Sequence, residues 1–491
     1  MPNTYDRLTD HMRRIADVRY AAAVLHWDQE VNLPPRGQAQ RARQLSTLSG
    51  YAHELSTSDD LRALIESARS EDLDADQARN VELIDKDFEK ATRFPTEFIV
   101  RLSEATSTAY HAWIQARRAN DFTRYADAFT HMVELQREKA ELAGFDDHPY
   151  DALLDDYEPG ATVRDLDTLF DGVRTDLGAL LAEILDRPAP DSSFMQGPYP
   201  DDVQWAYGLH LLEQMGYDFE AGRQDRSEHP FTTSFGPDDV RVTTRVKDDD
   251  LSDMIWSCIH EGGHALYEQG LPADQYGLPL GDSVSLGIHE SQSRLWENHV
   301  GRSLAYWRCN YPDLQQRFPD ALGNVSLETF YRGMNRVQPS LIRTDADEVT
   351  YHLHVMIRYE IEKDLITGNL RPADVRDRWN ADYRSHLGID VPDDARGVLQ
   401  DVHWAHGGFG YFPTYSLGSF YAAQFFHHAD QELDDLEGMV TRGELRPLLD
   451  WLRTNIHRHG RRYPAAELCR RITGEELNVR YFLTYVREKW L

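Results

Sequence analysis

LSDMIWSCIHEGGHALYEQG, residues 251–270, combines a helical pattern of apolar residues with a cluster of ionisable side chains. The apolar positions recur at helical spacing and predict one buried stripe: Leu251, Met254, Ile255, Cys258, Ile259, Ala265 and Leu266. Gly270 and Pro272 predict the end of the helix just beyond this cluster. The stretch therefore predicts a helix that packs into a core along one side.

His260 and His264 project from the same side of this helix, one turn apart. Both imidazoles can therefore reach a single zinc ion, and Glu261 is offset toward water bound on that metal. Zinc acidifies such a water molecule, and the glutamate takes its proton. The alternative is a pair of histidines satisfied in a core or on the surface, but the helical context favours the metal site.

A hydrolytic zinc site needs a third protein ligand and an open fourth position. The acidic candidates downstream are Glu268, Asp282, Glu290 and Glu297. Glu268 lies on the histidines' own helix, where it cannot easily complete a triangle around the ion. Glu290 is favoured because residues 286–298 show a second helical pattern, which could pack across the first helix after a Gly/Pro-rich turn. Glu297 could instead pair with Arg294 or support a ligand from behind.

The rest of the chain is mainly α-helical by the same criterion. Thr162 predicts a helix cap, followed by apolar residues at helical spacing: Leu166, Leu169, Phe170, Val173, Leu177, Leu180 and Leu181. Continuous β signal is confined to about residues 229–246, where a turn at Gly236-Pro237-Asp238-Asp239 predicts one hairpin. Because no internal repeat and no long Gly/Ser linker divides the sequence, we expect a single large two-lobed helical body.

The composition restricts the possible partners. The 491 residues carry 83 acidic and 52 basic side chains, a formal net charge of −31, and only six of the basic residues are lysine. This charge works against nucleic acid and anionic membranes as partners and favours solubility. An acid-rich, lysine-poor surface predicts a protein that stays soluble in concentrated salt, and an ordinary acidic enzyme is the alternative.

Targeting and redox signals are absent from the sequence. No window reaches 18 uncharged apolar residues, and residues 1–14 are polar, so we expect a soluble, cytoplasmic protein. Cys258, Cys309 and Cys469 are an odd number at wide spacings, which is atypical of a disulfide framework or a four-cysteine zinc site. We therefore expect buried thiols.

Six separated motifs follow one another along the chain. They are His229-Pro230-Phe231, Asp239-Val240-Arg241-Val242-Thr243, the histidine helix, His289-Glu290-Ser291-Gln292, Ile342-Arg343-Thr344-Asp345-Ala346-Asp347 and Gly397-Val398-Leu399-Gln400-Asp401-Val402-His403-Trp404. In this order they resemble the carboxypeptidase Taq family of metallocarboxypeptidases. The resemblance extends from Trp27-Asp28-Gln29 and Pro34-Pro35 to Thr473-Gly474-Glu475, almost the whole chain.

The resemblance implies a mainly helical, clamshell-like fold of the gluzincin, neurolysin-like type. It implies a single catalytic domain over residues 1–491 with a deep groove, a small β-hairpin beside the metal helix, and helices of about residues 1–80 that could overhang the groove. The implied activity is the release of single residues from peptide C-termini by a homodimer with one zinc or cobalt ion per subunit. Carried over by position, His260, His264 and Glu290 are metal ligands and Glu261 is the general base and acid.

Further motif residues are candidates for substrate binding. A free substrate carboxylate is recognised best by an arginine fork, and Arg343 is the first candidate, although it could instead pair with Asp345 or Asp347. The hairpin that carries His229 and Arg241 could offer an edge strand to an extended peptide. The alternative is that this hairpin segment has a purely structural role.

Attack on a peptide carbonyl develops negative charge on oxygen, which needs a donor besides the metal. Tyr411, Tyr415 and His403 are candidates because they lie in a glycine-rich stretch, and Tyr415 is favoured among them. Their rings could equally pack in a core.

Other conspicuous residues favour structural interpretations. The histidines His427-His428 and His457 with His459 lack a suitable nearby acid and are predicted to lie on the surface. Trp27 and Asp28 are typical of a packed tryptophan with a capping aspartate, although this segment could also lie over the groove.

Two other classes of function stay open at this point. One is a related zinc oligoendopeptidase or aminopeptidase, which a requirement for a free substrate C-terminus would distinguish. The other is a noncatalytic helical protein that holds a structural metal or none, which a Glu261→Gln substitution would distinguish.

Overall fold

The computed structural model describes residues 3–491, and these divide into two compact units. The first unit contains the described residues through Thr92 together with residues 190–334 and 421–477. The second unit contains residues 93–189, 335–420 and 478–491. The chain therefore crosses between the units several times, which explains why no linker divides the sequence.

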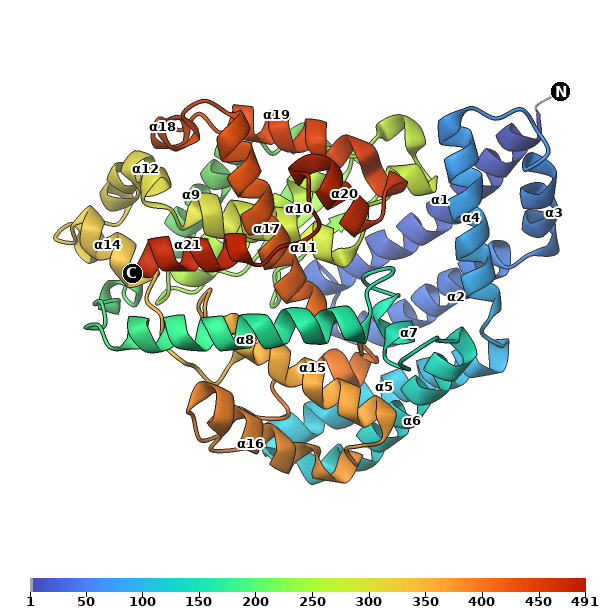
Figure 1. Ribbon diagram of the computed structural model, residues 1–491, viewed down its shortest axis with the longest axis horizontal. Helices are drawn as coiled ribbons and strands as arrows, with labels where there is room; N and C mark the ends of the chain where they lie inside the picture. The colour runs from blue at the N-terminus through green and yellow to red at the C-terminus, as the bar shows by residue number, and fades with distance from the viewer. Residues whose placement is uncertain (1–2) are drawn as a thin grey trace. The chain divides into compact units, whose positions relative to one another are not determined.

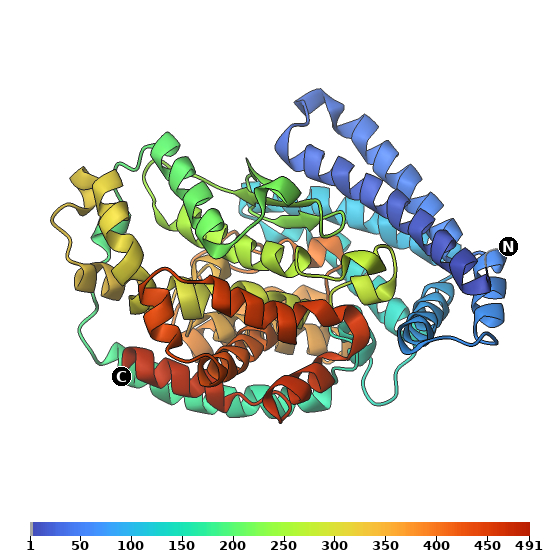
Figure 2. The ribbon, with the colours of Figure 1, turned by 90° about the horizontal axis from the view of Figure 1, so that it is seen from above.

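The first unit is helical with one small sheet. Its helices are α1 (Thr4–Val31), α2 (Gln38–Ser56), α3 (Asp59–Ala68), α4 (Ala75–Thr92), α9 (Asp201–Met215), α10 (Ser252–Glu268), α11 (Leu286–Arg294), α12 (Leu304–Arg317), α13 (Pro319–Leu322), α14 (Leu327–Met334), α18 (Leu436–Thr441), α19 (Arg446–Asn455) and α20 (Ala465–Thr473). The helices α1 and α2 lie side by side as an antiparallel pair (Figures 1 and 2).

The helix α10 forms as the sequence predicts. All seven residues of the apolar stripe are buried, and the helix ends at Glu268, before Gly270 and Pro272. Its neighbour α11 begins at a Ser285 cap, whose hydroxyl accepts the Ile288 amide, and continues without interruption as a π-helix, Leu295–Gly301. The predicted second helix over residues 286–298 is therefore confirmed, and its final turns are wider than α-helical.

Glycine at position 263 lets α11 approach α10 closely. A Cβ atom at Gly263 would lie 2.7 Å from the Cα of Ser293 and 2.8 Å from the carbonyl oxygen of Gln292. Both neighbouring atoms are backbone, so they cannot move aside without moving α11 itself. The sequence therefore brings Glu290 on α11 toward the histidines of α10 by omitting a side chain.

This close contact gives a stability prediction. Gly263→Ala should destabilise the fold by about 1–3 kcal/mol, because the added methyl group overpacks a backbone contact. Gly178 on α8 (Val163–Leu185) is the matched control, since nothing lies within 4 Å of its hypothetical Cβ and it is exposed. Gly178→Ala should stabilise by up to about 1 kcal/mol. Denaturant unfolding of both variants tests this, and equal midpoints would contradict it.

The sheet consists of β1 (Gly222–Arg226), β2 (Thr232–Ser234) and β3 (Val240–Thr244) in the order β1-β3-β2. The predicted hairpin of β2 and β3 is confirmed, with Thr232 opposite Val242. The expectation that β structure is confined to residues 229–246 is wrong, because β1 pairs in parallel with β3. Its sequence, Gly-Arg-Gln-Asp-Arg, is polar, as edge strands tolerate, and so lacks the apolar alternation that predicts a strand.

The sheet packs against α10, so the small sheet beside the histidine helix is confirmed. The hydroxyls of Thr244 and Ser257 lie 2.7 Å apart, and the thiol of Cys258 lies 3.5 Å from the Thr244 hydroxyl. Cys258 and Cys469 are buried, as expected, whereas Cys309 is half-buried.

The second unit is helical throughout its described residues. Its helices are α5 (Thr96–Ala119), α6 (Ala126–Ala143), α7 (Asp151–Leu154), α8 (Val163–Leu185), α15 (Tyr351–Thr367), α16 (Val375–Leu387) and α21 (Arg480–Trp490), and α17 (Phe412–Glu432) begins here and continues into the first unit. Thr162 caps α8 through a hydrogen bond from the Asp165 amide, as predicted. The carboxy-terminal helix α21 lies along α8 (Figures 1 and 2).

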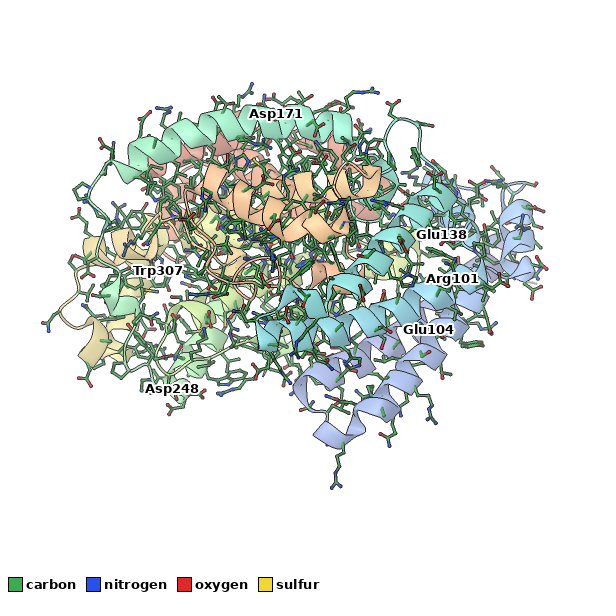
Figure 3. The ribbon with its side chains drawn as sticks, turned by 90° about the horizontal axis from the view of Figure 1, so that it is seen from below. Arg101, Glu104, Glu138, Asp171, Asp248 and Trp307 are labelled. Atoms are coloured by element: carbon green, nitrogen blue, oxygen red, sulfur yellow. The ribbon has the colours of Figure 1, made fainter. Side chains whose placement is uncertain are left out.

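Charged side chains lie on the outer faces of these helices. Figure 3 shows Arg101 on α5 beside Glu138 on α6, and the Arg101 Nη1 donates to Glu138 across 2.9 Å. Asp171 points outward from α8 and is exposed. Within residues 3–491, no helix is both long and apolar enough to cross a membrane.

Candidate active site

Three side chains of the first unit converge on one point beside α10. The ligand atoms of His260, His264 and Glu290 all lie within 4.8 Å of one another. The Oε2 atom of Glu290 lies 3.6 Å from Nε2 of His260 and 3.4 Å from Nε2 of His264. Two ligands of a tetrahedral ion at about 2.1 Å are themselves about 3.4 Å apart, so this spacing fits a cation such as zinc. The donor set therefore fits the metal that the sequence predicts.

A network of charges holds Glu290 in place. Arg294 lies one turn further along α11 and donates its Nε proton to Glu290 across 2.7 Å. Burial raises the pKa of Glu290, but the charges of Arg294 and His260 outweigh it and hold the pKa well below its usual range. The carboxylate is therefore ionised at neutral pH, as a metal ligand must be.

Glu297 contacts the imidazole of His260. Its Oε2 atom lies 2.8 Å from Nδ1 of His260, and it also accepts from Arg294 and Arg302. Burial raises the pKa of Glu297, but Arg294 and the hydrogen bond with His260 hold it far below its ordinary value. Of the two sequence interpretations, pairing with Arg294 and support of a ligand, the structure shows both contacts. Glu297 is not part of the three-ligand cluster.

Glu261, the predicted base, contacts the edge strand β2. It is buried, and its Oε2 atom lies 2.7 Å from the hydroxyl of Thr232 on the edge strand β2. Burial raises the pKa of the Glu261 carboxyl above its usual value, although the nearby His260 opposes the rise. A carboxylate with a raised pKa is a better proton acceptor near neutral pH.

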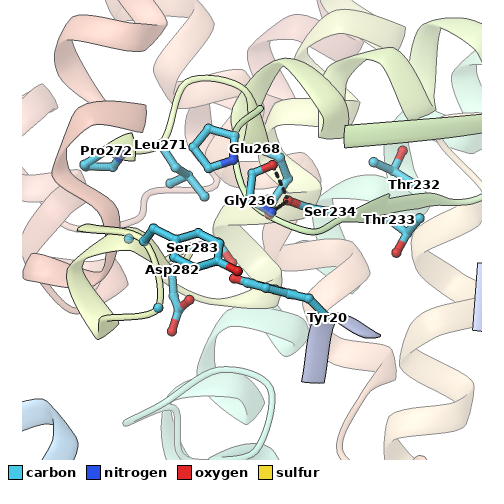
Figure 4. Close-up of a pocket in the computed structure, with 14 residues that line it drawn as sticks. Tyr20, Thr232, Thr233, Ser234, Gly236, Glu268, Leu271, Pro272, Asp282 and Ser283 are labelled. Carbon is cyan, nitrogen blue, oxygen red and sulfur yellow. Dashed lines mark hydrogen bonds between the residues drawn. The ribbon is translucent and has the colours of Figure 1, made fainter. Parts of the chain in front are cut away.

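A polar pocket of about 370 Å³ lies beside β2 in the first unit. Figure 4 shows it between Thr232 and Ser234 of β2, Glu268 of α10, Asp282, and Tyr20 of α1. Glu268 and Asp282, two of the candidate ligands, therefore face this pocket and are absent from the metal-binding cluster. Burial raises the pKa of Asp282 to about 7, whereas Glu268 is ionised and disfavours an anionic group in the pocket.

The segment near residue 27 is a packing element of this unit. Trp27 is buried, and the guanidinium groups of Arg241 and Arg223 lie 4.4 Å and 5.3 Å from its ring centroid. The packed tryptophan is thus confirmed. The capping role of Asp28 is wrong, because α1 continues to Val31 and Asp28 pairs with Arg41 at 2.6 Å.

The two candidates of the hairpin lie at different places on it. His229 is exposed just before β2, and its carbonyl oxygen accepts a hydrogen bond from Ser227. Arg241 lies on β3, where Asp239 accepts two of its hydrogen bonds at 2.8 Å. The Arg241 side chain therefore has a structural partner within the sheet region, whereas His229 is held there through its backbone.

A second cluster of predicted residues lies in the second unit around Arg343. Arg343 is buried, and it donates to Oδ1 of Asp401 through Nε at 3.1 Å and Nη2 at 2.9 Å. Its Nη1 donates to the Tyr351 hydroxyl across 2.9 Å. The alternative of an ion pair with Asp345 or Asp347 is wrong, because the acidic partner is 58 residues away in sequence.

The three oxyanion candidates lie together next to Arg343. The hydroxyl of Tyr415 is 3.1 Å from Nε2 of His403, and the Tyr411 ring centroid is 5.2 Å from that of Tyr415. The Arg343 guanidinium lies 4.8 Å from the Tyr415 ring centroid. Burial lowers the pKa of His403 to about 3, and the charges of Arg343 and Arg358 act in the same direction although Asp401 opposes them. His403 is therefore neutral near pH 7.

Some important residues were missed or misplaced in the sequence analysis. His457 was predicted on the surface, but it is fully buried and its Nε2 lies 3.0 Å from Oε1 of Gln292. The expectation of a surface position is therefore wrong. His457 follows Leu452 and Ile456, which are both buried, and this apolar pattern indicates a position in the core. Asp401 and His289 lie within motifs, but no local sequence pattern identifies their partners.

Comparisons with known proteins agree with these motifs. Residues 7–490 match the model of the family described as carboxypeptidase Taq (M32) metallopeptidase. The chain is 43% identical to thermostable carboxypeptidase 1 of Thermus thermophilus, with 99% of this chain and 98% of that protein covered. A crystal structure of an M32 carboxypeptidase from Deinococcus radiodurans R1 is 41% identical, with 99% and 98% of the two chains covered and a TM-score of 0.97. The structure of a protein called CHT is 55% identical, with 99% of each chain covered and a TM-score of 0.97.

Proposed function

This chain belongs to the carboxypeptidase Taq (M32) family of metallopeptidases and is a metal-dependent carboxypeptidase, and we propose that its hydrolytic centre is the cluster around α10. His260, His264 and Glu290 are the proposed metal ligands. The observation that supports this most strongly is the spacing of their three ligand atoms, which suits one small cation.

Glu261 is the proposed general base and acid. A divalent cation held by His260, His264 and Glu290 would supply an acidified water molecule and would polarise the scissile carbonyl. The hydroxyl of Thr232 is bonded to Oε2 of Glu261 and leaves Oε1 to take the proton of the attacking water. Glu261 then carries this proton to the amine that leaves with the released amino acid. Such a mechanism needs no covalent acyl-enzyme.

The proposed peptide-binding element is β2. It pairs with β3 along one edge, and the structure describes no strand along its other edge. An extended peptide could add there through main-chain hydrogen bonds, which carry no sequence selectivity. Thr232 links this strand to Glu261, so a bound peptide would pass the base. His229 and Arg241 flank the strand and are proposed to position the peptide.

The cluster of the second unit is proposed to recognise the reacting end of the substrate. Arg343 retains N–H groups that its bonds to Asp401 and Tyr351 do not use, and these are proposed to bind the free carboxylate. Tyr415 is the proposed donor to the developing oxyanion, with neutral His403 and Tyr411 beside it.

Several finer expectations remain proposals. We propose that the metal is zinc or cobalt, one ion per subunit, because imidazole and carboxylate ligands suit both. On the family resemblance and the sequence, we also propose a homodimer, a cytoplasmic location, a single catalytic domain over residues 1–491 and a deep groove. The net charge of −31 supports function in concentrated salt. Light scattering and activity, measured from low to molar KCl, test the dimer and the salt requirement.

The cleavage pattern can be tested with one peptide in two forms, one with a free C-terminus and one amidated. Mass spectrometry should follow an N-acetylated peptide with a free C-terminus, in high salt with added zinc or cobalt. We expect loss of one C-terminal residue at a time, and no loss with a chelator or with the amidated peptide. Internal cuts would instead identify an endopeptidase, and cleavage of the amidated form would contradict carboxylate recognition.

A further inference from the structure

His289 lies between a metal-binding histidine and a carboxylate. Its Nδ1 atom is 2.6 Å from Nδ1 of His264, and its Nε2 atom is 2.8 Å from Oε1 of Glu268. The rings of His264 and His289 are 4.6 Å apart at their centroids. The motif that supplies Glu290 therefore supplies a second polar contact to the site, which the proposed reaction does not use.

The hydrogen-bond roles in this chain of contacts follow from the metal-ligand role of His264. If Nε2 of His264 binds the cation, that nitrogen carries no proton, so the proton of the neutral ring lies on Nδ1. The facing Nδ1 of His289 must then accept this proton's hydrogen bond, and the proton of His289 lies on Nε2. That N–H donates to Glu268. Each of the four ring nitrogens of His264 and His289 is consequently a metal ligand, a donor or an acceptor, and each donor faces an acceptor.

The two metal-binding histidines are supported differently. His260 donates its Nδ1 proton directly to Glu297, which Arg294 and Arg302 also hold. Glu268 is one turn beyond His264 on α10 and reaches it only through His289, which comes from α11. One helix thus brings both the carboxylate ligand Glu290 and the imidazole that supports His264.

The surroundings hold His289 and Glu268 firmly. Both side chains are 17% exposed, and the Tyr267 ring lies 5.3 Å from the His289 ring. Burial raises the pKa of Glu268, but its hydrogen bond with His289 outweighs this and holds the pKa below its usual value, so the acceptor is ionised. Glu268 faces the polar pocket beside Ser234, as Figure 4 shows.

We propose that Glu268 and His289 are positioning residues that fix the tautomer and ring orientation of His264 for metal binding. Such outer partners fix the geometry of ligating histidines and raise their basicity. The proposal rests on the proposed metal centre, and it assigns a role to a carboxylate that sequence reasoning considered only as a ligand.

Metal affinity tests the proposal without reference to activity. The zinc dissociation constant is measured by chelator competition for the wild type, His289→Phe and Glu268→Gln. His289→Phe keeps a ring of similar size but removes both nitrogens, and zinc binding should weaken about 10–100-fold. Glu268→Gln keeps an acceptor oxygen for the His289 proton but loses the charge, so a smaller loss is expected. The visible bands of the cobalt-loaded protein should also shift in His289→Phe.

A matched control separates positioning from general damage. His352 is a buried histidine whose Nδ1 atom lies 2.9 Å from the Ser416 hydroxyl, and it belongs to the second unit. His352→Phe should leave zinc affinity within about twofold, since it touches no proposed ligand. Equal zinc affinity in wild type and folded His289→Phe would overturn the proposal, as would equal losses in both phenylalanine variants. Undiminished metal binding by His264→Ala would overturn the proposed metal centre instead.

Discussion

Glu261→Gln is expected to lower kcat by about 10²–10⁴-fold while the protein keeps its bound metal. Glutamine has nearly the same shape, and its oxygen can still accept the hydrogen bond from Thr232 that holds the side chain in place. The amide, however, cannot take a proton from water at neutral pH. Because Glu261 is not one of the three converging ligands, metal binding should survive. Initial rates on the acetylated peptide and metal analysis of the same samples test both statements.

The control and the contradicting outcomes are equally specific. Glu220→Gln makes the same chemical change at an exposed residue of the first unit and should leave kcat unchanged. Near wild-type hydrolysis by Glu261→Gln would exclude Glu261 as the base. Loss of metal together with activity would show that the substitution disturbs the ligands, and the lost hydrolysis would then not identify Glu261 as the base.

The sequence predicts the histidine helix and the projection of its two histidines from one side because the relevant information is local. The apolar stripe of α10 and the four-residue spacing of its histidines follow from helix geometry alone. Selecting Glu290 required one further step, the expectation that residues 286–298 pack across α10. The backbone contact at Gly263 is the physical basis of that packing, and it is invisible in a pattern of apolar residues.

The remaining errors concern partners that are distant in sequence. The strand β1 was missed because its polar residues are acceptable only once β3 lies beside it. In the sequence, Asp345 and Asp347 are the predicted ion-pair partners of Arg343 if its role is structural. In the structure, the carboxylate that neutralises Arg343 belongs to Asp401. A hydrogen-bond partner 58 residues away leaves no periodic signal, although its position within a motif marks it as important.

Asp401 compensates two buried cations at once. Its Oδ1 accepts from Arg343, and its Oδ2 accepts from Nε of Arg358 across 2.6 Å. The Arg358 side chain is 0% exposed and that of Arg343 is 6% exposed, so neither can turn toward water. Removing this charge leaves two guanidinium groups in a medium that solvates them poorly.

Asp401→Asn should therefore destabilise the protein by about 3–5 kcal/mol, the usual cost of an uncompensated buried charge. Asp390 provides the matched control in the same unit, because it pairs with Arg384 at 2.6 Å but both side chains are about three-quarters exposed, at 76% and 74%. Asp390→Asn should change the free energy of unfolding by less than about 0.5 kcal/mol. Chemical denaturation at neutral pH measures both, and similar losses would show that burial does not set the cost.

The pH dependence of unfolding gives an independent readout of the same carboxylate. Burial raises the pKa of Asp401, but the charges of Arg343 and Arg358 outweigh it and hold the pKa far below the usual range. The Asp401 carboxylate consequently binds a proton less readily in the folded state than in the unfolded state, where an aspartate has a pKa of about 3.9. The stability that Asp401 contributes is thus complete above that pH and is lost as the pH falls below it. Between neutral pH and about pH 3, the free energy of unfolding should decrease less steeply for Asp401→Asn than for the wild type, and parallel curves would contradict this assignment.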